Sequence, residues 1–266
     1  MPGPQITPID AQLEFKTLVL SDLHLGTRES KAAEVNYLLE HTKVKKLILN
    51  GDIIDGWSLR RKGGWTPEHT RFVSLVLDRV ENRECEVIYT RGNHDDLLGR
   101  FLPLSFGSLQ ILEDYIHDTP NGPYLVLHGD VFDSITQNNP FLSHIGDVGY
   151  QTLLKFNRLY NLIRRAFGMD YFSLSKVIKR KVKEMVNILS RFEDHLEALV
   201  LKRGCVGAIV GHLHIPADKM IGKIHYINSG DWVESLTCAV EHDDGKWEIL
   251  GYAEFCKRLQ IKAIKS

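Results

Sequence analysis

Cysteine is scarce in this chain and never occurs in closely spaced pairs. The 266 residues include four cysteines, and no two of them form a C-x-x-C pair. Without that spacing, the sequence predicts neither a structural zinc site nor a disulfide framework. We expect the cysteines to be reduced packing residues in a reducing compartment.

Long apolar runs and an excess of one charge are also missing. No stretch approaches the ~18 consecutive apolar residues of a transmembrane helix. Residues 1–10 are polar and Pro-rich, so no signal peptide is expected and the predicted location is cytoplasmic. The formal net charge is −1, and no aromatic–basic strand surface is visible, so no nucleic-acid partner is expected.

The first third of the chain alternates between short apolar runs and helical patterns. Buried strands are predicted at 17–20, 47–49 and 86–89. A helix is predicted over 31–41 with Ser30 as its N-cap, and a second begins at Thr66-Pro67. Strand–helix–strand units in series predict an α/β domain with a partly parallel sheet.

The rest of the chain divides into a helical block and further strands. Residues 111–116 and 124–127 flank a turn at 121–123, and residues 139–201 look mostly helical. Strands are predicted again at 205–210, 225–227, 236–240 and 246–250. We therefore expect a core of residues 16–138 and 202–253, with residues 139–201 inserted as a helical lid over the active site.

Five polar motifs each follow a predicted buried strand directly. In chain order they are Asp22-Leu23-His24, Gly51-Asp52-Ile53-Ile54-Asp55, Gly92-Asn93-His94-Asp95, His128-Gly129-Asp130 and Gly211-His212-Leu213-His214. Ligands of open α/β sheets bind beyond the carboxyl ends of the strands, so the five clusters should converge on one site.

The residue types in these motifs are ligands of divalent metals. Residues two apart, such as Asp22 and His24, would face the same way on an extended segment. The full set is too large for one ion but fits two ions that share a carboxylate, and Asp52, in the middle of the set, is the natural bridge. The predicted ligands are Asp22, His24, Asp52, Asn93, His128, His212 and His214. Two such ions can clamp a phosphoryl oxygen and lower the pKa of a water held between them from about 15.7 towards neutrality.

Other motif residues have predicted supporting roles. Glycines beside the ligands would permit positive φ angles and close approach of the chain to the metals. Asp55 and Asp95 are candidate carboxylates behind the ligands, orienting an imidazole. Arg91 could contact a phosphate or be a solvated strand end, and Trp57 could line the substrate pocket or pack in the core.

The ordered set of motifs resembles that of the calcineurin-like metallophosphoesterases, over residues 17–230. The resemblance implies a two-sheet β-sandwich core flanked by helices, with a dinuclear site at its edge. It implies that His94 is the histidine that stabilises the transition state or protonates the leaving oxygen. It also implies how the ligands are shared: one metal takes Asp22, His24, Asp52 and His214, and the other takes Asp52, Asn93, His128 and His212. Manganese is the metal this resemblance favours, and iron or zinc would also suit the ligands.

A closer resemblance is to the UDP-2,3-diacylglucosamine pyrophosphatases of lipid A synthesis. The shared features are Gly51 to Trp57, the HGD motif, the helical insertion and Gly230-Asp231-Trp232. This resemblance implies hydrolysis of UDP-2,3-diacylglucosamine to lipid X and UMP. That family has Arg after the Asn of the third motif, whereas this chain has His94. The departure leaves open a paralogue acting on another lipid- or nucleotide-linked phosphate.

The predicted insertion combines an apolar stripe with many basic residues. Between positions 155 and 183 it has nine lysines and arginines, Arg164 and Arg165 among them, and one acid, Asp170. Such a helix pair suits a lipid phosphate or an anionic surface, so Arg164 and Arg165 are candidate substrate contacts and peripheral association with the inner membrane is a further expectation. A solvated helix face and a core-packing stripe are the alternatives.

Two other function classes remain open from the sequence. The same core could act on a cyclic nucleotide, a nucleic-acid end or a phosphomonoester. The chain could instead be a silent scaffold for protein assembly, although every ligand position is filled. The oligomeric state does not follow from the sequence.

Overall fold

Two β-sheets pack face to face in the computed structural model, which describes residues 11–132 and 189–265 apart from 62, 84, 96–98, 100 and 101. The chain divides into two units, Met1–Asp130 with Leu199–Ser266 and Val131–Ala198. All seven predicted metal ligands belong to the first unit. Residues 133–188, most of the predicted insertion, lie outside the described residues, whereas residues 189–202 are helical.

The first sheet has seven strands and is parallel at its centre. β1, β2, β3 and β5 run parallel, while β4, β11 and β12 are antiparallel to their neighbours. In spatial order the strands are β12 (Trp247–Gly251), β11 (Thr237–Glu241), β1 (Leu13–Leu20), β2 (Thr42–Asn50), β3 (Glu86–Thr90), β5 (Leu109–Leu112) and β4 (Leu104–Phe106).

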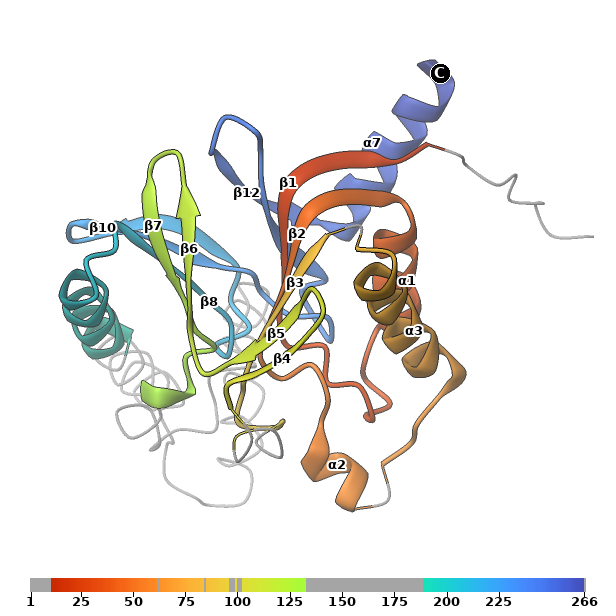
Figure 1. Ribbon diagram of the computed structural model, residues 1–266, viewed down its shortest axis with the longest axis horizontal. Coiled ribbons are helices and arrows are strands. Elements are labelled where there is room, and N and C mark those ends of the chain that lie inside the picture. Colours follow the sequence, from red (N-terminus) through yellow and green to blue (C-terminus); the bar gives the residue numbers. More distant parts are fainter. Residues whose placement is uncertain are drawn as a thin grey trace, which may run out of the picture. The chain divides into compact units, whose positions relative to one another are not determined.

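The second sheet has five strands, three of them parallel. β7, β8 and β10 run parallel, and β6 and β9 are antiparallel edge strands. In spatial order the strands are β6 (Tyr115–Thr119), β7 (Gly122–Val126), β8 (Gly207–Val210), β10 (Ile224–Asn228) and β9 (Ala217–Ile221). In Figure 1 these strands lie in a layer of their own, separate from the layer that contains β1, β2 and β3.

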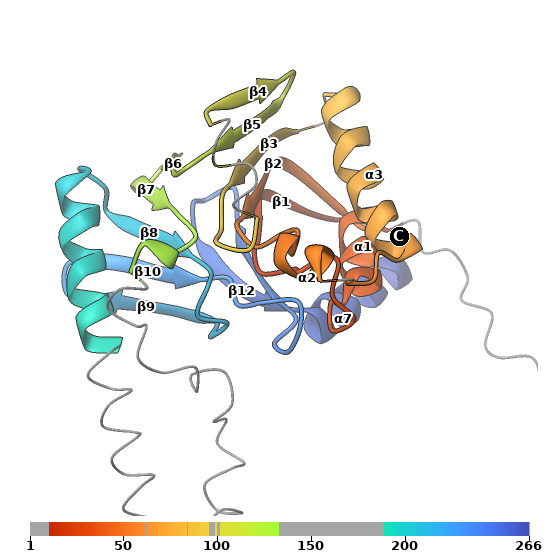
Figure 2. The ribbon, with the colours of Figure 1, turned by 90° about the horizontal axis from the view of Figure 1, so that it is seen from below.

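Besides the helical residues 189–202, four helices accompany the sheets, and three of these four cover the outer face of the first sheet (Figures 1 and 2). α3 begins as the sequence predicts, because Thr66 caps it and Pro67 is its first residue. The helices are α1 (Ala32–Glu40), α2 (Gly56–Arg60), α3 (Pro67–Glu81) and α7 (Tyr252–Lys265), and α2 is a short helix in the loop after β2.

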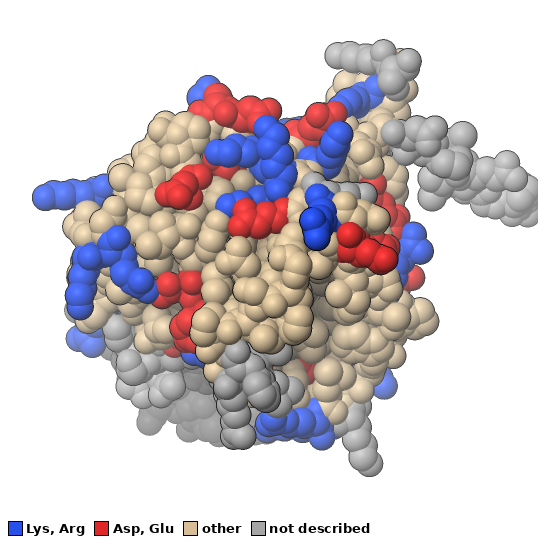
Figure 3. All heavy atoms as spheres, in the orientation of Figure 1, with Lys and Arg blue, Asp and Glu red and all other residues tan. Residues whose placement is uncertain are grey.

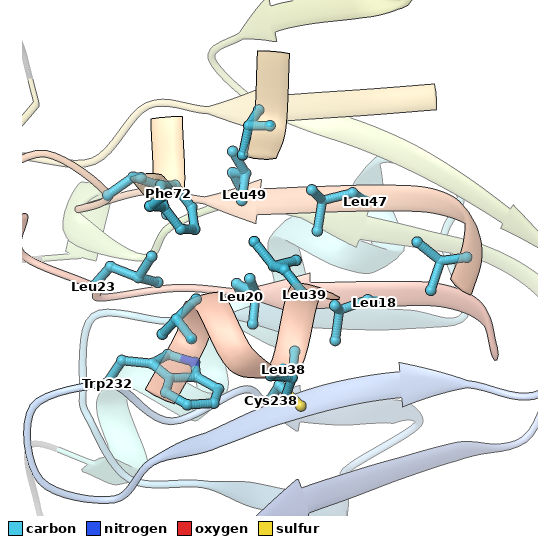
Figure 4. Close-up of a cluster of buried hydrophobic side chains, with 14 of the residues drawn as sticks. Leu18, Leu20, Leu23, Leu38, Leu39, Leu47, Leu49, Phe72, Trp232 and Cys238 are labelled. Atoms are coloured by element: carbon cyan, nitrogen blue, oxygen red, sulfur yellow. The ribbon is translucent and has the colours of Figure 1, made fainter. Parts of the chain in front are cut away.

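Successive side chains of the central strands in the first sheet point alternately into two hydrophobic cores, one on each face of the sheet. Leu18 and Leu20 of β1 point towards the helices, whereas Val19 between them packs against the second sheet. β2, β3 and β11 alternate in the same way, because successive side chains of a strand point to opposite faces. Figure 4 shows the helix-side core, in which Trp232 is fully buried. A sandwich with helices on its outer face is therefore confirmed.

The structure differs from the sequence prediction at several elements. The predicted N-cap Ser30 does not cap α1: its hydroxyl donates to the Leu23 carbonyl, and Lys31 is at the cap position without a side-chain bond. The single strand expected over 111–116 is two strands, one in each sheet, since the chain crosses between sheets at residues 113–114. The sequence also gave no prediction for β4, β9, α2 and α7.

Among the described residues, none of the helices is long and apolar enough to span a bilayer. Acidic and basic side chains are intermixed on the face seen in Figure 3. The described part of the chain therefore shows, on that face, no large patch of one sign, in keeping with the net charge of −1.

Candidate metal centre

The five motifs lie at the carboxyl ends of parallel strands, as their positions in the sequence predict. β1, β2 and β3 end just before Asp22, Asp52 and Asn93, and β7 and β8 end just before His128 and His212. Parallel strands bring their carboxyl ends to one edge of a sheet, and the two sheets face each other. The five loops therefore meet at the edge of the sandwich.

The backbone at this edge is held in an unusual conformation. Five of the seven non-glycine residues with positive φ in the described chain are predicted ligands: Asp22, His24, Asp52, His212 and His214, with φ between 48° and 62°. Such angles are uncommon outside glycine and are typical of functional sites. The side chains of Asp22 and His24 therefore converge, but the extended segment predicted to aim them is wrong. Left-handed backbone angles at both residues orient them instead.

Two glycines allow predicted ligands to approach the backbone closely. A Cβ atom on Gly92 would lie 2.3 Å from Oδ1 of Asp52, and one on Gly211 would lie 2.6 Å from Oδ2 of Asp22. Neither distance leaves room for a methyl group. Glycine is needed at both positions for contact with a carboxylate rather than for positive φ.

Asp22, His24 and His214 form the first cluster of potential ligands. One ligand atom from each lies within 4.8 Å of the others. Oδ2 of Asp22 accepts a hydrogen bond from the backbone N–H of His212 at 3.0 Å, which fixes the carboxylate. Oδ1 lies 3.1 Å from Nε2 of His214 yet has no partner in hydrogen-bond geometry.

Asp52, His128 and His212 form a second cluster of the same size. Nδ1 of His128 is 3.0 Å from the carbonyl oxygen of Asn50, so it carries the proton and donates it there. That leaves Nε2 of His128 directed towards Oδ2 of Asp52, 3.3 Å away.

Asp52 lies between the two clusters. Its Oδ2 atom is 3.3 Å from Nε2 of His128 and 3.9 Å from Nε2 of His24, which belongs to the first cluster. Its Oδ1 atom accepts a hydrogen bond from the backbone N–H of His94 at 2.8 Å. This position suits a carboxylate shared by two ions, the role predicted for Asp52.

The donor atoms of both clusters and of Asn93 fit metal ions. Four predicted ligand atoms are buried and have no hydrogen-bond partner, which is costly unless a cation binds them. They are Oδ1 of Asp22, Nε2 of His24, Oδ1 of Asn93 and Nε2 of His128. Oxygen and imidazole donors together suit divalent transition metals, so the clusters are consistent with a dinuclear site.

The electrostatics of the site also favour a cation. Burial disfavours the charged imidazolium of His128, but the carboxylates of Asp52 and Asp22 outweigh it and raise the pKa of His128 to about 10. Burial likewise opposes ionisation of Asp22 and Asp52, yet nearby imidazoles hold the pKa of both carboxyls below the ordinary value. The carboxylates thus attract positive charge, which a metal ion can supply in place of the proton.

Asp55 joins two histidines through one oxygen. Its Oδ2 atom lies 2.9 Å from Nδ1 of His94 and 3.3 Å from Nδ1 of His24, and its Oδ1 atom accepts from the Ser58 N–H as the N-cap of α2. Burial raises the pKa of Asp55, but the hydrogen bonds from His24 and Ser58 outweigh it, so the pKa lies below its usual value. Asp55 therefore lies where a carboxylate that orients imidazoles must lie.

Among the described residues, Asp95 forms hydrogen bonds with backbone N–H groups and with a hydroxyl, and not with an imidazole as predicted. It accepts hydrogen bonds from the N–H groups of Gly92 and Ile53 and from the Tyr89 hydroxyl, at 2.6, 3.0 and 2.5 Å. These bonds tie the loop that carries Asn93 to the loop that carries Asp52. Burial, with the charge of Asp52, raises the pKa of Asp95.

The predicted substrate contacts have different surroundings. Trp57 is half-exposed, and its ring lies 4.4 Å from that of His94. The Arg91 guanidinium pairs with Glu113 at 2.6 Å and Asp130 at 3.4 Å, so carboxylates already neutralise it. Arg164 and Arg165 lie outside the described residues.

Two supporting residues were missed in the sequence. Asp231 follows β10, a third parallel strand of the second sheet, and its Oδ1 is 4.0 Å from Nδ1 of His214 while it caps the turn at Val233 and Glu234. Asn50, the last residue of β2, bonds the Thr90 hydroxyl and the Leu127 carbonyl. The Gly-Asp after a buried strand was a usable signal for Asp231, whereas nothing local indicates the role of Asn50.

Comparison with known families agrees with this geometry. A family model described as calcineurin-like phosphoesterase matches residues 15–216. The chain belongs to the calcineurin-like phosphoesterase family. It is thus a member of a family of metal-dependent hydrolases, as the motifs predicted, and its Asp and His clusters are candidate metal sites.

Curated relatives of this phosphoesterase are distant but extend over most of its length. A UDP-2,3-diacylglucosamine hydrolase of Cellvibrio japonicus is 26% identical over 207 residues, which cover 76% of this chain and 83% of the relative. The protein of the same name from Stenotrophomonas maltophilia is 26% identical over 255 residues, covering 88% and 97%.

The solved structures to which the chain is similar share less sequence with it. A conserved protein of Streptococcus pneumoniae described as a predicted phosphoesterase superposes with a TM-score of 0.42 at 15% identity, covering 90% of both chains. The phosphoesterase Yfce of E. coli gives 0.39 at 13% identity, covering 89% of this chain and 98% of its own.

Proposed function

We propose that this phosphoesterase hydrolyses the pyrophosphate bond of UDP-2,3-diacylglucosamine, giving lipid X and UMP. The observation that carries the proposal is the convergence of two Asp/His clusters on Asp52 in a chain whose matched relatives bear that activity in their names. Two divalent metals, manganese first and iron or zinc as alternatives, would be held by Asp22, His24, Asp52, Asn93, His128, His212 and His214.

The chemistry divides between the metals and the side chains. When bound, the metals lower the pKa of a coordinated water and neutralise charge on the phosphoryl oxygens. Water adds its oxygen to one phosphorus, and the bond from that phosphorus to the bridging oxygen breaks. The electron pair remains on the bridging oxygen, which leaves as part of the second phosphate.

His94 would act at that leaving oxygen. Its Nδ1 lies 2.9 Å from Asp55, and its side chain is 25% exposed and lines a pocket, so a substrate can reach part of the ring. An imidazole can donate a proton near neutral pH, which suits a departing oxygen. The same position holds Arg in the pyrophosphatases that the chain resembles, which is why a related lipid- or nucleotide-linked phosphate is the alternative substrate.

The predicted lid would bind the acyl chains. Residues 139–201 would supply an apolar groove, and Arg164 and Arg165 would contact the lipid phosphate. A cytoplasmic protein that touches the anionic inner membrane would meet this substrate at its source.

Phosphorus NMR of the manganese-loaded protein with UDP-2,3-diacylglucosamine tests the proposal. We expect UMP and lipid X to appear with the wild-type chain and with Asp78→Ala, a change at an exposed site on α3, but not with Asp52→Ala. Metal content, measured on the same samples, should fall with Asp52→Ala alone.

Two other results would redirect the assignment. Metal-dependent cleavage of an aryl phosphodiester without cleavage of the lipid precursor would keep the phosphoesterase chemistry and discard this substrate. A chain that binds no stoichiometric metal and cleaves neither compound would be a scaffold instead.

A further inference from the structure

A pocket of about 500 Å³ opens beside His94 and Asp55 and contains none of the predicted metal ligands. The loop after Leu25 lines one side, and α2 with the segment up to Gly64 lines the other. The motifs account for Asp55 and His94 in its walls, whereas the remaining wall residues come from α2 and from loop positions that belong to no motif.

Two guanidinium groups line this pocket without an assigned partner. Arg28 and Arg61 are exposed, and neither forms an ion pair with a carboxylate among the described residues. The acids of the lining are Glu29 and Asp55, and Asp55 is already bonded to His24, His94 and Ser58. Two cations therefore remain against one uncommitted carboxylate, which favours an anionic group in the pocket.

The walls of the pocket are tied together before any ligand arrives. The Ser58 hydroxyl donates to the Gly26 carbonyl at 3.1 Å, and the Gly63 N–H donates to the Ser58 carbonyl at 2.7 Å. The Asp55 N–H donates to the Leu25 carbonyl at 2.8 Å. A binding site that is already ordered loses less entropy when it takes up a ligand.

The wall next to the reaction centre is aromatic. The Trp57 ring lies over the His94 imidazole at an interplanar angle of 35°, and 48% of the residue is exposed. A flat or apolar group entering past His94 would therefore meet an indole surface, with the arginines around it. This combination matches an organic phosphate rather than a free inorganic anion.

We infer that the pocket takes the leaving half of the substrate and that Arg28 and Arg61 bind its phosphate. The inference rests on the proposed function in one respect: the bond broken joins two phosphates. The electron pair of the broken bond stays on the departing phosphate, whose negative charge increases, and two guanidinium groups stabilise that charge. Diphosphate diesters are therefore preferred over diesters with a neutral alcohol or phenol as leaving group.

The first test compares two substrates of the manganese-loaded full chain. We expect Arg28→Met and Arg61→Met each to lower kcat/KM for UDP-glucose about 10-fold, or about 1.4 kcal/mol. The same variants should leave bis(p-nitrophenyl) phosphate hydrolysis within about twofold, since its leaving group carries no phosphate. Arg60→Met is the matched control, because Arg60 is an exposed neighbour on α2 that does not line the pocket.

A binding measurement separates this inference from the proposed function. Titration calorimetry with uridine α,β-methylene diphosphate, which resists hydrolysis, should show about 10-fold weaker binding for Arg61→Met and unchanged binding for Arg60→Met. That result would support the pocket even if the lipid precursor is not cleaved. Equal losses on both substrates, or unchanged binding in the arginine variants, would overturn the inference while leaving the proposed function intact.

Discussion

At the residue scale, the site depends on glycines that let carboxylates approach the backbone. Gly92 precedes Asn93, and the Cβ of any other residue there would overlap Oδ1 of Asp52. The same oxygen accepts the His94 N–H, so a shift of Asp52 would move a predicted metal ligand and the loop of the predicted catalytic histidine together.

We predict that Gly92→Ala lowers kcat of the phosphoesterase by on the order of 100-fold, because a displacement of about 1 Å in a positioned group costs that much. Metal binding should weaken in parallel. Gly251→Ala is the matched control, since a Cβ there meets nothing within 4 Å. Steady-state kinetics and metal content of both variants check the prediction, and wild-type turnover by Gly92→Ala would refute it.

The ligand types could be predicted from the motifs, but the way the backbone presents them could not. Asp22 and His24 are two residues apart, and the expectation of an extended segment failed because both adopt positive φ. Such angles are imposed by contacts from elsewhere, including the hydrogen bond from the His24 N–H to the Asp52 carbonyl at 2.9 Å. No local propensity of Asp or His reveals them.

At the element scale, α3 links secondary structure to the site. Its N-terminus has a capping box in which the Thr66 hydroxyl accepts the His69 N–H at 3.3 Å and His69 Nδ1 accepts the Thr66 N–H at 3.2 Å. The same Nδ1 accepts the N–H of Gly26 at 3.3 Å, two residues after His24. Thr66 was predictable as a cap, whereas the contact between His69 and Gly26 was not, because it spans 43 positions.

We predict that Thr66→Ala lowers the free energy of unfolding by about 1 kcal/mol, the usual cost of losing an N-cap. Ser74→Ala is the control, because Ser74 is exposed in the middle of the same helix and alanine is the better helix former there. Urea unfolding followed by circular dichroism measures both. Equal stability of the two variants would show that the capping box does not stabilise α3.

The break between β5 and β6 shows the limit of prediction for strands. Residues 111–116 have the composition of one strand, yet Leu112 ends in the first sheet and Tyr115 begins in the second. Strand propensity is the same in either sheet, so the crossing depends on which neighbour each half pairs with. β9 was missed for a similar reason: its middle residues are exposed on an edge strand, and it lacks an apolar run.

At the scale of the whole molecule, a buried charge joins the two sheets. Glu241 of β11 is fully buried and lies 2.6 Å from Lys16 and 2.8 Å from His117, which belongs to β6 of the second sheet. The Thr17 hydroxyl donates to the same carboxylate at 2.6 Å. Burial opposes ionisation, but these hydrogen bonds lower the pKa of Glu241 to about 2.

This shift gives a pH dependence of stability with a definite sign. The pKa of Glu241 is lower in the folded chain than its ordinary value of about 4.3. The ionised Glu241, with its hydrogen-bonded partners, therefore stabilises the fold at pH values above about 4.3. The stabilisation is lost as the pH falls from there to about 2. We predict that Glu241→Gln costs on the order of 3 kcal/mol at pH 7, since it breaks a buried ion pair.

Urea unfolding of the wild type and Glu241→Gln from pH 7 to pH 3 tests this prediction. The difference between them should shrink below about pH 4.3, where the wild-type carboxylate begins to lose its advantage. Glu234→Gln, at an exposed site, should follow the wild type throughout. A difference that stays constant with pH would mean that packing rather than charge at position 241 holds the sheets.

The sequence by itself determined the class of fold, the family and the set of Asp, His and Asn side chains at the site. These follow from local patterns, because strand periodicity and the order of motifs are written within short segments. The tertiary structure decided the positive φ angles of Asp22 and His24, the crossing of the chain between β5 and β6, and that Arg28 and Arg61 line one pocket with Trp57. Those facts depend on pairing between residues tens to hundreds of positions apart, and such pairing is set by packing of the whole chain rather than by any local preference.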